Sequence, residues 1–344
     1  MNIVREEDIR QIISKIPYEM CEGQTFLITG ANGFLASYMV DTLMYMKRSG
    51  YIKKCTVLAL CRSREKAERV FKDWLNDGDF RLLIQSVEEE ITYAGKIDYI
   101  VHAASYSTTH LFETHAADIM KANIIGCYHL LELAREKEIK SFLFFSSGAV
   151  YGDAEVNELR EDKTFAVDYL DMKNSYAVGK RAGEALCRAY WHQYHIPAKA
   201  VRISHTYGPG IDLNDGHVYS DFAKSIVENR DLIIHGDGLA SRSFCYVSDA
   251  ICAFYLILFL GDGGEMYNMA NPDMNVTIKE LADALTENVF PERGLHVVVE
   301  KPVVDQIVYK VKVNIEKLMN LGWQPVIDLS DGFKRVVRSI EYPI

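Results

Sequence analysis

The chain has 344 residues, of which 49% are hydrophobic and 25% charged, a composition typical of a soluble globular protein with a sizeable core. Its net charge of −10 argues against a broad surface for nucleic acid or anionic membrane, so neither partner is expected. The apolar run 251–260 is too short to span a bilayer, and residues 1–20 lack an apolar signal-peptide core. The seven cysteines are scattered without a CxxC pair, so we expect a reduced, cytoplasmic protein without a disulfide framework or zinc site.

Short β-rich runs alternate with longer helical stretches through the first two-thirds of the chain. Most of these runs are continuously apolar, as strands buried on both faces should be, and they occupy 25–29, 56–60, 80–84, 97–102, 141–146 and 199–203. The helical candidates that separate them occupy 34–48, 65–75, 113–138 and 175–194. This alternation predicts an α/β fold with a doubly wound, parallel Rossmann sheet.

After residue 203 the sequence becomes rich in glycine turns, and further helices are expected near 218–229, 248–260, 277–289 and 314–320. We predict a Rossmann dinucleotide-binding domain at 23–205. A smaller, discontinuous C-terminal substrate-binding lobe is expected at 206–240 and 261–344. Residues 241–260 are expected to return to the first domain, with 243–247 in its sheet, and residues 1–22 to form an N-terminal helical extension.

The first strand leads into the sequence TGANGFLA, which reads as a glycine turn followed by a helix start. Gly30 permits the tight turn, Gly33 lets the backbone approach a pyrophosphate, and Ala36 allows close packing of strand and helix. The spacing is GxxGxxA rather than the usual GxGxxG, but it stands at the first βα turn of the alternating pattern. We therefore expect a dinucleotide cofactor here, with contacts from Gly30, Asn32, Gly33, Phe34 and Leu35.

The second strand lacks the acidic residue that commonly holds the adenine ribose, and Arg62, Ser63 and Arg64 follow it instead. A guanidinium near that ribose favours a 2′-phosphate, which predicts NADP rather than NAD. The alternative, NAD, applies if these arginines are only solvated residues at the start of a helix.

Tyr176 and Lys180 stand four residues apart on one face of a predicted helix. A phenol ionises at about pH 10, so it acts as a base only when nearby positive charge stabilises its anion. Ser147 lies at the carboxyl end of a predicted strand, the edge at which open α/β sheets bind ligands. The three residues together predict oxidation of a substrate hydroxyl.

With these motifs the chain resembles the extended short-chain dehydrogenases that modify nucleotide sugars. The resemblance extends from residue 29 to about residue 332. It is carried by TGANGFLA (29–36), HAAS (102–105), NIIGCYHLLELA (123–134), SSGAVYGD (146–153), YAVGK (176–180), HTYGPG (205–210) and SRSFCYVSD (241–249).

The resemblance implies roles for further residues. Ser147, Tyr176 and Lys180 match the catalytic triad, and Asn123 matches an asparagine that kinks its helix. The implied cofactor contacts also include Arg62, Ala103, Ala104, Ser105, Tyr176, Lys180 and His205. The implied contacts to a nucleotide-diphosphate sugar come from Ser147, Gly148, His205 and Arg242, where Arg242 grips the diphosphate and His205 replaces a frequent Asn. A homodimer through helices 113–138 and 175–194 is also implied.

Three departures bear on the reaction. Ala149 stands where UDP-glucuronate decarboxylases carry Glu, and Gly148 and Ala149 stand where 4,6-dehydratases carry an Asp-Glu pair. The basic cluster expected before the final LGW motif reads YKVKV (309–313). Without these acids the hydride machinery remains, which favours a nucleotide-diphosphate-sugar 4-epimerase.

Several alternatives stay open. A 4-ketosugar reductase needs the same machinery, and a dehydratase or decarboxylase-like lyase is possible if Asp168, Asp171 or His205 replaces the missing acid. A non-catalytic NAD(P)-sensing protein is a further alternative. The histidine pairs 110/115 and 192/195 lack a third ligand at a recognisable spacing, so no metal site is expected.

Overall fold

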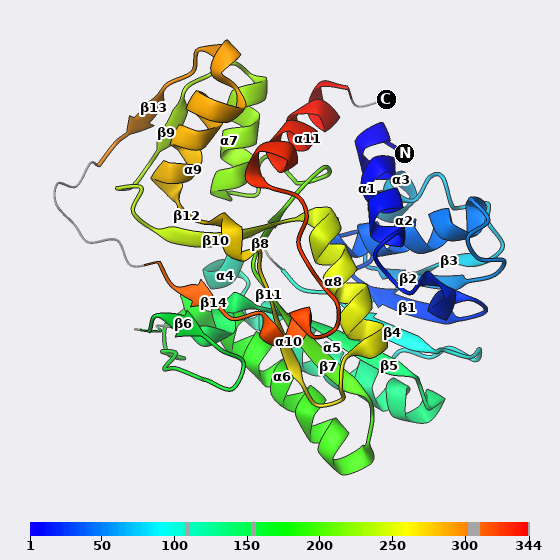
Figure 1. Cartoon of the computed structure of the whole chain (residues 1–344). Helices are drawn as coiled ribbons and strands as arrows, with labels where there is room; N and C mark the ends of the chain where they lie inside the picture. Colours follow the sequence, from blue (N-terminus) through cyan, green and yellow to red (C-terminus); the bar gives the residue numbers. More distant parts are fainter. Residues whose placement is uncertain (107–110, 153, 155, 302–309, 343–344) are drawn as a thin grey trace.

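The computed structural model describes residues 1–106, 111–152, 154, 156–301 and 310–342, and its centre is a seven-stranded parallel sheet (Figure 1). The strand order is β11-β7-β5-β4-β1-β2-β3. The strands are β1 (Thr25–Thr29), β2 (Thr56–Cys61), β3 (Phe80–Ile84), β4 (Tyr99–His102), β5 (Ser141–Ser147), β7 (Ala198–Ile203) and β11 (Met266–Met269). The predicted doubly wound α/β fold is therefore confirmed.

The order of the strands reverses between β1 and β4. From β1 the chain proceeds to β2 and β3 on one side, and from β4 to β5, β7 and β11 on the other. Helices that leave neighbouring strands in opposite directions open a crevice at the carboxyl ends of those strands. This crevice is where the fold places a ligand.

Helices cover both faces of the sheet. α5 (Ala116–Lys137) and α6 (Ser175–Tyr194) contribute to one hydrophobic cluster, and α2 (Phe34–Arg48) and α8 (Val247–Leu260) to the other (Figure 1). Successive β1 residues alternate between the clusters, since Phe26 and Ile28 belong to one and Leu27 to the other. This double burial explains why the strands read as continuous apolar runs. The shorter α3 (Arg64–Val70) and α4 (Leu111–Thr114) follow β2 and β4.

The expected return of 243–247 to the main sheet is wrong. The strand β10 (Ser241–Tyr246) pairs in parallel with β8 (His205–Tyr207) and antiparallel with β12 (Asn275–Thr277), forming a separate three-stranded sheet. β8 follows β7 after a single intervening residue, so β10 finds its partner beyond the end of the main sheet. The edge of the main sheet beside β7 is occupied instead by β11, which pairs with β7 in parallel.

The remaining elements are short sheets, helices and turns outside the main sheet. Two small sheets pair β9 (Leu232–Ile234) with β13 (Val297–Val299) and β6 (Glu158–Leu159) with β14 (Lys312–Val313). The other helices are α7 (Val218–Val227), α9 (Ile278–Ala284), α10 (Glu316–Met319) and α11 (Leu329–Glu341). Single turns occur at η1 (Tyr18–Cys21), η2 (Gly148–Tyr151), η3 (Met172–Asn174), η4 (Pro272–Met274), η5 (Leu285–Val289) and η6 (Pro291–Arg293). The division of the chain into domains stays a prediction.

The N-terminal segment begins with α1 (Ile3–Ile13), which packs against α2, α8 and α11 (Figure 1). In the part of the chain that the structure describes, no helix combines the length and apolarity needed to cross a membrane. The cytoplasmic location stays a prediction.

Candidate active site

A cavity of about 1650 Å³ lies at the carboxyl end of the sheet. Its wall includes nearly all the site residues predicted from the sequence, which are Gly30, Asn32, Gly33, Phe34, Leu35, Arg62, Ala103, Ala104, Ser105, Ser147, Gly148, Tyr176, Lys180, His205 and Arg242. Asn123 is fully buried and does not line this wall. The fold therefore brings the motifs of the sequence into one crevice.

The glycine turn packs closely against the end of β4. Gly30 has a φ of +59°, and a Cβ atom there would lie 2.7 Å from the Cα of Ala104. Gly33 is the N-cap of α2 and no side chain caps this helix. The N–H groups of the first turn of α2 are therefore directed at the cavity with the positive end of the helix dipole behind them. This cradle fits the pyrophosphate of a dinucleotide.

His102 joins the ends of β1 and β4 beneath this turn. Its Nε2 donates to the Ala122 carbonyl oxygen (3.1 Å), and its Nδ1 therefore accepts from the Thr29 hydroxyl (2.9 Å). The same hydroxyl oxygen accepts from the Ala104 N–H (3.2 Å). Burial lowers the pKa of His102 to about 3, so the ring stays neutral and holds one tautomer. Its role in the HAAS motif is structural support for the turn.

Only one of the two arginines after β2 reaches the cavity. Arg62 lines the wall, donates from Nη1 to the Tyr106 hydroxyl (2.6 Å) and stacks 4.7 Å from the centre of that ring. Arg64 lies in α3 and pairs with Glu68 (3.4 Å). An arginine contact to the adenosine ribose can therefore come only from Arg62 among these two.

Tyr176 and Lys180 project from the first turns of α6 into the same region. Lys180 Nζ donates to the Phe145 carbonyl oxygen (2.6 Å) and lies 5.5 Å from the centre of the Tyr176 ring. Burial lowers the pKa of Lys180 to about 7. Burial raises the pKa of Tyr176, and the nearby Ser147 hydroxyl acts in the opposite direction by hydrogen bonding. A positive charge on the bound substrate or cofactor is needed to lower the pKa of the Tyr176 phenol far enough for it to act as a base.

Ser147 is the last residue of β5, where the strand turns into η2. Its Oγ accepts from the Ala149 N–H (3.2 Å), which fixes the side chain at the start of the turn. The preceding Ser146 donates to the Glu184 carboxylate (2.6 Å), and Arg202 binds this carboxylate through two nitrogens (3.0 and 2.8 Å). This buried ion pair was not predicted from the sequence, although Glu184 follows Lys180 by one helical turn.

Asn123 and Phe112 lie beside α6, and a Cβ atom on Gly179 of that helix would lie 3.4 Å from Asn123. Asn123 Nδ2 donates to the Ile119 carbonyl oxygen (2.8 Å) and the Ser105 hydroxyl (3.1 Å), and α5 continues through it without interruption. Phe112 stacks on Tyr176 with ring centres 4.6 Å apart and planes 4° apart. The Phe112 carbonyl oxygen also accepts from the Ser175 hydroxyl (2.8 Å). No pattern in the sequence indicated this contact, because it joins two segments 63 residues apart.

The opposite wall of the cavity carries His205, Arg242 and His217. Burial, together with Arg242 and His217, lowers the pKa of His205 to about 4. The His205 and His217 rings are 6.3 Å apart, and His217 stacks on Tyr219 at 5.1 Å. This arrangement offers one permanent cation and two imidazoles to an anionic ligand. His217 was not predicted from the sequence.

The structure narrows the search for a replacement acid. Gly148 and Ala149 both line the cavity, whereas Asp168 and Asp171 do not. These two carboxylates accept from the N–H groups of Leu170 and Lys173 (both 3.0 Å). Of the three candidates named from the sequence, only His205 shares the cavity with Tyr176.

Of the segment YKVKV (309–313), the cavity is lined by the two valines. Val311 and Val313 line it, whereas Lys310 pairs with Glu280 (2.6 Å). Tyr309 lies outside the described residues, as does His110 of the first histidine pair. Within the described ranges, no group of three or more His, Cys, Asp or Glu could hold a metal ion.

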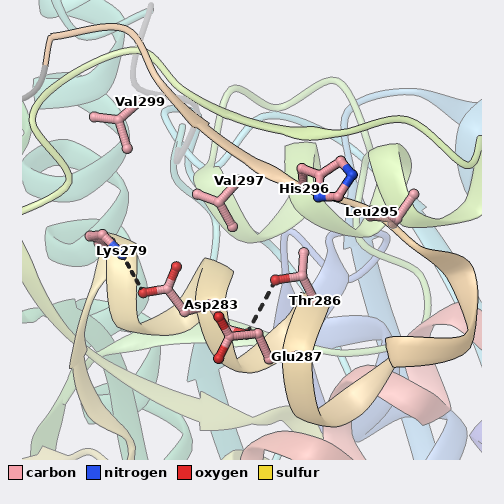
Figure 2. Close-up of a pocket in the computed structure, with 8 residues that line it drawn as sticks. All are labelled: Lys279, Asp283, Thr286, Glu287, Leu295, His296, Val297 and Val299. Atoms are coloured by element: carbon pink, nitrogen blue, oxygen red, sulfur yellow. Dashed lines mark hydrogen bonds and ion pairs between the residues drawn. The ribbon is translucent and has the colours of Figure 1, made fainter.

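A second, smaller cavity of about 330 Å³ lies between α9 and β13 (Figure 2). Lys279 and Asp283 form an ion pair along α9 at 2.5 Å, and Thr286 Oγ1 donates to the Asp283 carbonyl oxygen (3.2 Å). None of the predicted site residues lines this cavity. The large cavity therefore remains the candidate active site.

Comparison with known proteins adds a family match and several relatives. Residues 26–270 match a family model described as NAD dependent epimerase/dehydratase family. The chain is 29% identical to UDP-glucuronic acid decarboxylase 6 of Arabidopsis thaliana, covering 89% of this chain and 85% of that protein. It is 28% identical to dTDP-D-glucose 4,6-dehydratase of Homo sapiens, covering 90% and 88%.

Solved structures show the same fold. UDP-glucose 4-epimerase from Thermotoga maritima, solved with UDP-glucose, has a TM-score of 0.77 at 24% identity and covers 92% of this chain and 99% of its own. dTDP-glucose 4,6-dehydratase from Bacillus anthracis, solved with NAD, has a TM-score of 0.75 at 21% identity and covers 93% and 97%. These relatives and structures carry three different activity names, so the reaction must be argued from the site.

Proposed function

Because the chain belongs to the NAD dependent epimerase/dehydratase family, we propose that it is a nucleotide-diphosphate-sugar 4-epimerase. The observation that carries this proposal is the composition of the wall around Ser147. Tyr176 and Lys180 accompany Ser147 in the cavity, whereas Gly148 and Ala149 supply no acid or base. This set suits reversible oxidation at C4 and lacks the residues for elimination at C5 and C6.

In the proposed reaction Tyr176 removes the proton from the C4 hydroxyl. Ser147 donates a hydrogen bond to the C4 oxygen, and the Lys180 ammonium stabilises the phenolate. A dinucleotide held at the glycine turn would supply the acceptor and the donor of the hydride in this oxidation and reduction. The 4-ketosugar rotates in the cavity, and Tyr176 then gives its proton back to the oxygen on the inverted carbon. The protein ends the cycle in its starting protonation state.

The glycine turn would hold the pyrophosphate of the dinucleotide through the first turn of α2. We assign the adenosine ribose to the Arg62 side of the cavity. We favour NADP over NAD, because Arg62 follows β2 where an acidic residue would bind the ribose of NAD. Titration with NADH and NADPH tests this assignment: tighter binding of NADPH supports it, and tighter binding of NADH overturns it.

The substrate diphosphate would lie against Arg242 and His205. A guanidinium binds two phosphate oxygens at once, and the neutral His205 ring donates one further hydrogen bond. This placement leaves the sugar ring to reach toward Ser147 and Tyr176. Loss of nucleotide-sugar affinity in Arg242→Ala, with unchanged dinucleotide affinity, would support it, and unchanged affinity for both ligands would refute it.

We further propose a homodimer through α5 and α6. These helices expose Ile125, Tyr128, Trp191 and Tyr194, each between 38% and 47% accessible, and large apolar side chains grouped on two helices suit an interface with a second copy. Light scattering on the purified protein tests this proposal, since a monomer mass at micromolar concentration contradicts it.

Mass spectrometry of the products from UDP-, dTDP-, GDP- and CDP-sugars tests the reaction itself. An epimerase leaves the mass unchanged, whereas loss of water indicates a dehydratase and loss of carbon dioxide a decarboxylase. A gain of two hydrogens indicates a ketosugar reductase. No conversion in the presence of either dinucleotide would favour a non-catalytic sensor.

A further inference from the structure

The N-terminal helix α1 takes no part in the proposed chemistry, yet it is strongly attached to the rest of the molecule. It precedes the first strand and lies across α2, α8 and α11 rather than on the sheet (Figure 1). Its inner face buries Val4, Asp8, Ile9, Ile12 and Ile13. A carboxylate within such a face requires an explanation, because burying a charge is costly unless partners satisfy it.

Asp8 joins three elements at one point. Its fully buried carboxylate accepts from the hydroxyl of Tyr38 on α2 (3.2 Å) and of Tyr246 at the end of β10 (3.0 Å). It also accepts from Arg335 Nη1 on α11 (2.9 Å). Burial raises the pKa of Asp8 to about 6, against the opposing effect of these donors. One side chain of α1 thus connects the glycine-turn helix to two elements on the substrate side.

Arg5 lies one turn before Asp8 and reaches the wall of the main cavity. Its guanidinium stacks 3.8 Å from the centre of the Tyr38 ring and donates to Asp41 (2.7 Å) and the Ser37 hydroxyl (2.9 Å), all on α2. On its other side it approaches the loop after β8, since a Cβ atom on Gly210 would lie 3.3 Å from Arg5 Nη1. Arg5 therefore stands between the helix that receives the pyrophosphate and the opposite side of the cavity.

Other contacts of α1 divide between the same two sides. Glu6 accepts from the Tyr45 hydroxyl on α2 (3.0 Å), and Glu7 pairs with Arg338 on α11 (2.5 Å). Asn2 donates to the carbonyl oxygens of Ser339 (3.2 Å) and Tyr342 (3.1 Å) near the C-terminus. Movement of α11 and β10 away from α2 would have to break this set of contacts.

We propose that α1 is a clamp that holds the cavity closed around the dinucleotide and slows its release, with Arg5 and Asp8 as its positioning residues. The inference rests on the proposed function, because an epimerase recovers its hydride in every cycle and has no need to exchange the cofactor. A reductase must exchange the cofactor after each turnover, and a clamp of this kind would limit its rate.

Dissociation rates of NADH and NADPH from the full-length protein test the clamp. We expect Arg5→Gln and Asp8→Asn each to accelerate release about tenfold, the factor that loss of one charge-assisted hydrogen bond typically produces. Arg10→Gln is the matched control, because Arg10 lies on the same helix, is 63% exposed and does not line the main cavity. Its side-chain contacts are an ion pair with Glu6 (2.7 Å) and the Tyr45 ring, whose centre is 5.9 Å away. The release rate of this variant should stay within about twofold of the original protein.

A second control separates clamping from general loss of stability. Leu131→Ala removes a fully buried side chain from the cluster on the opposite face of the sheet and should lower the melting temperature without accelerating release. Unchanged release in folded Arg5→Gln and Asp8→Asn overturns the clamp, as does equal acceleration in Leu131→Ala. The measurement needs no sugar turnover, so the clamp can fail while the epimerase proposal stands, whereas absence of dinucleotide binding would overturn both.

Discussion

The two walls of the main cavity differ in the kinds of groups that line them. Around the glycine turn the dinucleotide wall presents backbone and small side chains, with Gly30 and Gly33 at the turn and Ala103 and Ala104 next to it. The substrate wall presents long polar side chains, above all Arg242, His205 and His217. Backbone groups at a helix start suit a pyrophosphate, whereas long side chains can change to suit different sugars and bases. The reaction therefore depends on the second wall and on the residues between the two walls.

The largest expected effect concerns Tyr176, which stands between the two walls. Tyr176→Phe removes the proposed base but keeps the ring that stacks on Phe112, so turnover should fall about 10²- to 10⁴-fold. Dinucleotide affinity should change little, because the hydroxyl group acts mainly in the chemical step. Steady-state kinetics and dinucleotide titration check this, with the exposed Tyr169→Phe as control. Activity within a few-fold of the original protein would show that the base is misassigned.

The next effect tests whether the dinucleotide wall depends on backbone shape. Gly30→Ala forces a Cβ atom to within 2.7 Å of Ala104 and strains a φ of +59°, so dinucleotide affinity should fall about a hundredfold. Gly23→Ala is the matched control, because Gly23 also has a positive φ (+71°) but its Cβ atom would meet nothing within 4 Å. Equal losses of affinity in both variants would mean that general strain, rather than the shape of the turn, is responsible.

A smaller effect is expected where a long side chain enters the dinucleotide wall. Arg62→Ala should weaken NADPH binding about tenfold and leave NADH binding nearly unchanged, because only NADPH carries a 2′-phosphate. Arg64→Ala should change neither affinity, since Arg64 pairs with Glu68 outside the cavity. If Arg62→Ala weakens both dinucleotides equally, Arg62 does not discriminate between them.

A further effect concerns the pH dependence of stability rather than the binding of a ligand. Burial holds the pKa of His102 at about 3, below its ordinary value near 6.5, so the unfolded chain binds a proton that the folded protein refuses between these values. His102 should therefore reduce stability as pH falls from 6.5 toward 3, by about 1.4 kcal/mol per pH unit. His102→Gln should remove this contribution. Urea unfolding of both proteins at pH 7, 6 and 5 measures it, and parallel curves would contradict the neutral, buried ring.

Features encoded by local sequence patterns could be predicted, whereas contacts between distant segments could not. The glycine turn, the strand ends and the Tyr176–Lys180 pair are local patterns, and each lies in the structure where its pattern placed it. The strand β10 was misplaced because its partner, β8, is an extension of β7 that no local pattern marks. Phe112 and His217 escaped notice because their contacts with Tyr176 and His205 join segments distant in sequence. The helix α11 was not predicted, although its sequence is strongly amphipathic, because Gly332 in its first turns is a poor helix former.

In a 4-epimerase the hydride removed from C4 returns to C4. This return is expected because Ser147, Tyr176 and Lys180 stand beside positions 148 and 149, which carry no acid for elimination. A nucleotide sugar deuterated at C4 tests it directly, since the deuterium marks where the hydride goes. We predict a product of unchanged mass with inverted C4 and with the deuterium retained there, as judged by NMR. Loss of water with the deuterium at C6, or replacement of the deuterium by hydrogen from added cofactor, would contradict the 4-epimerase proposal.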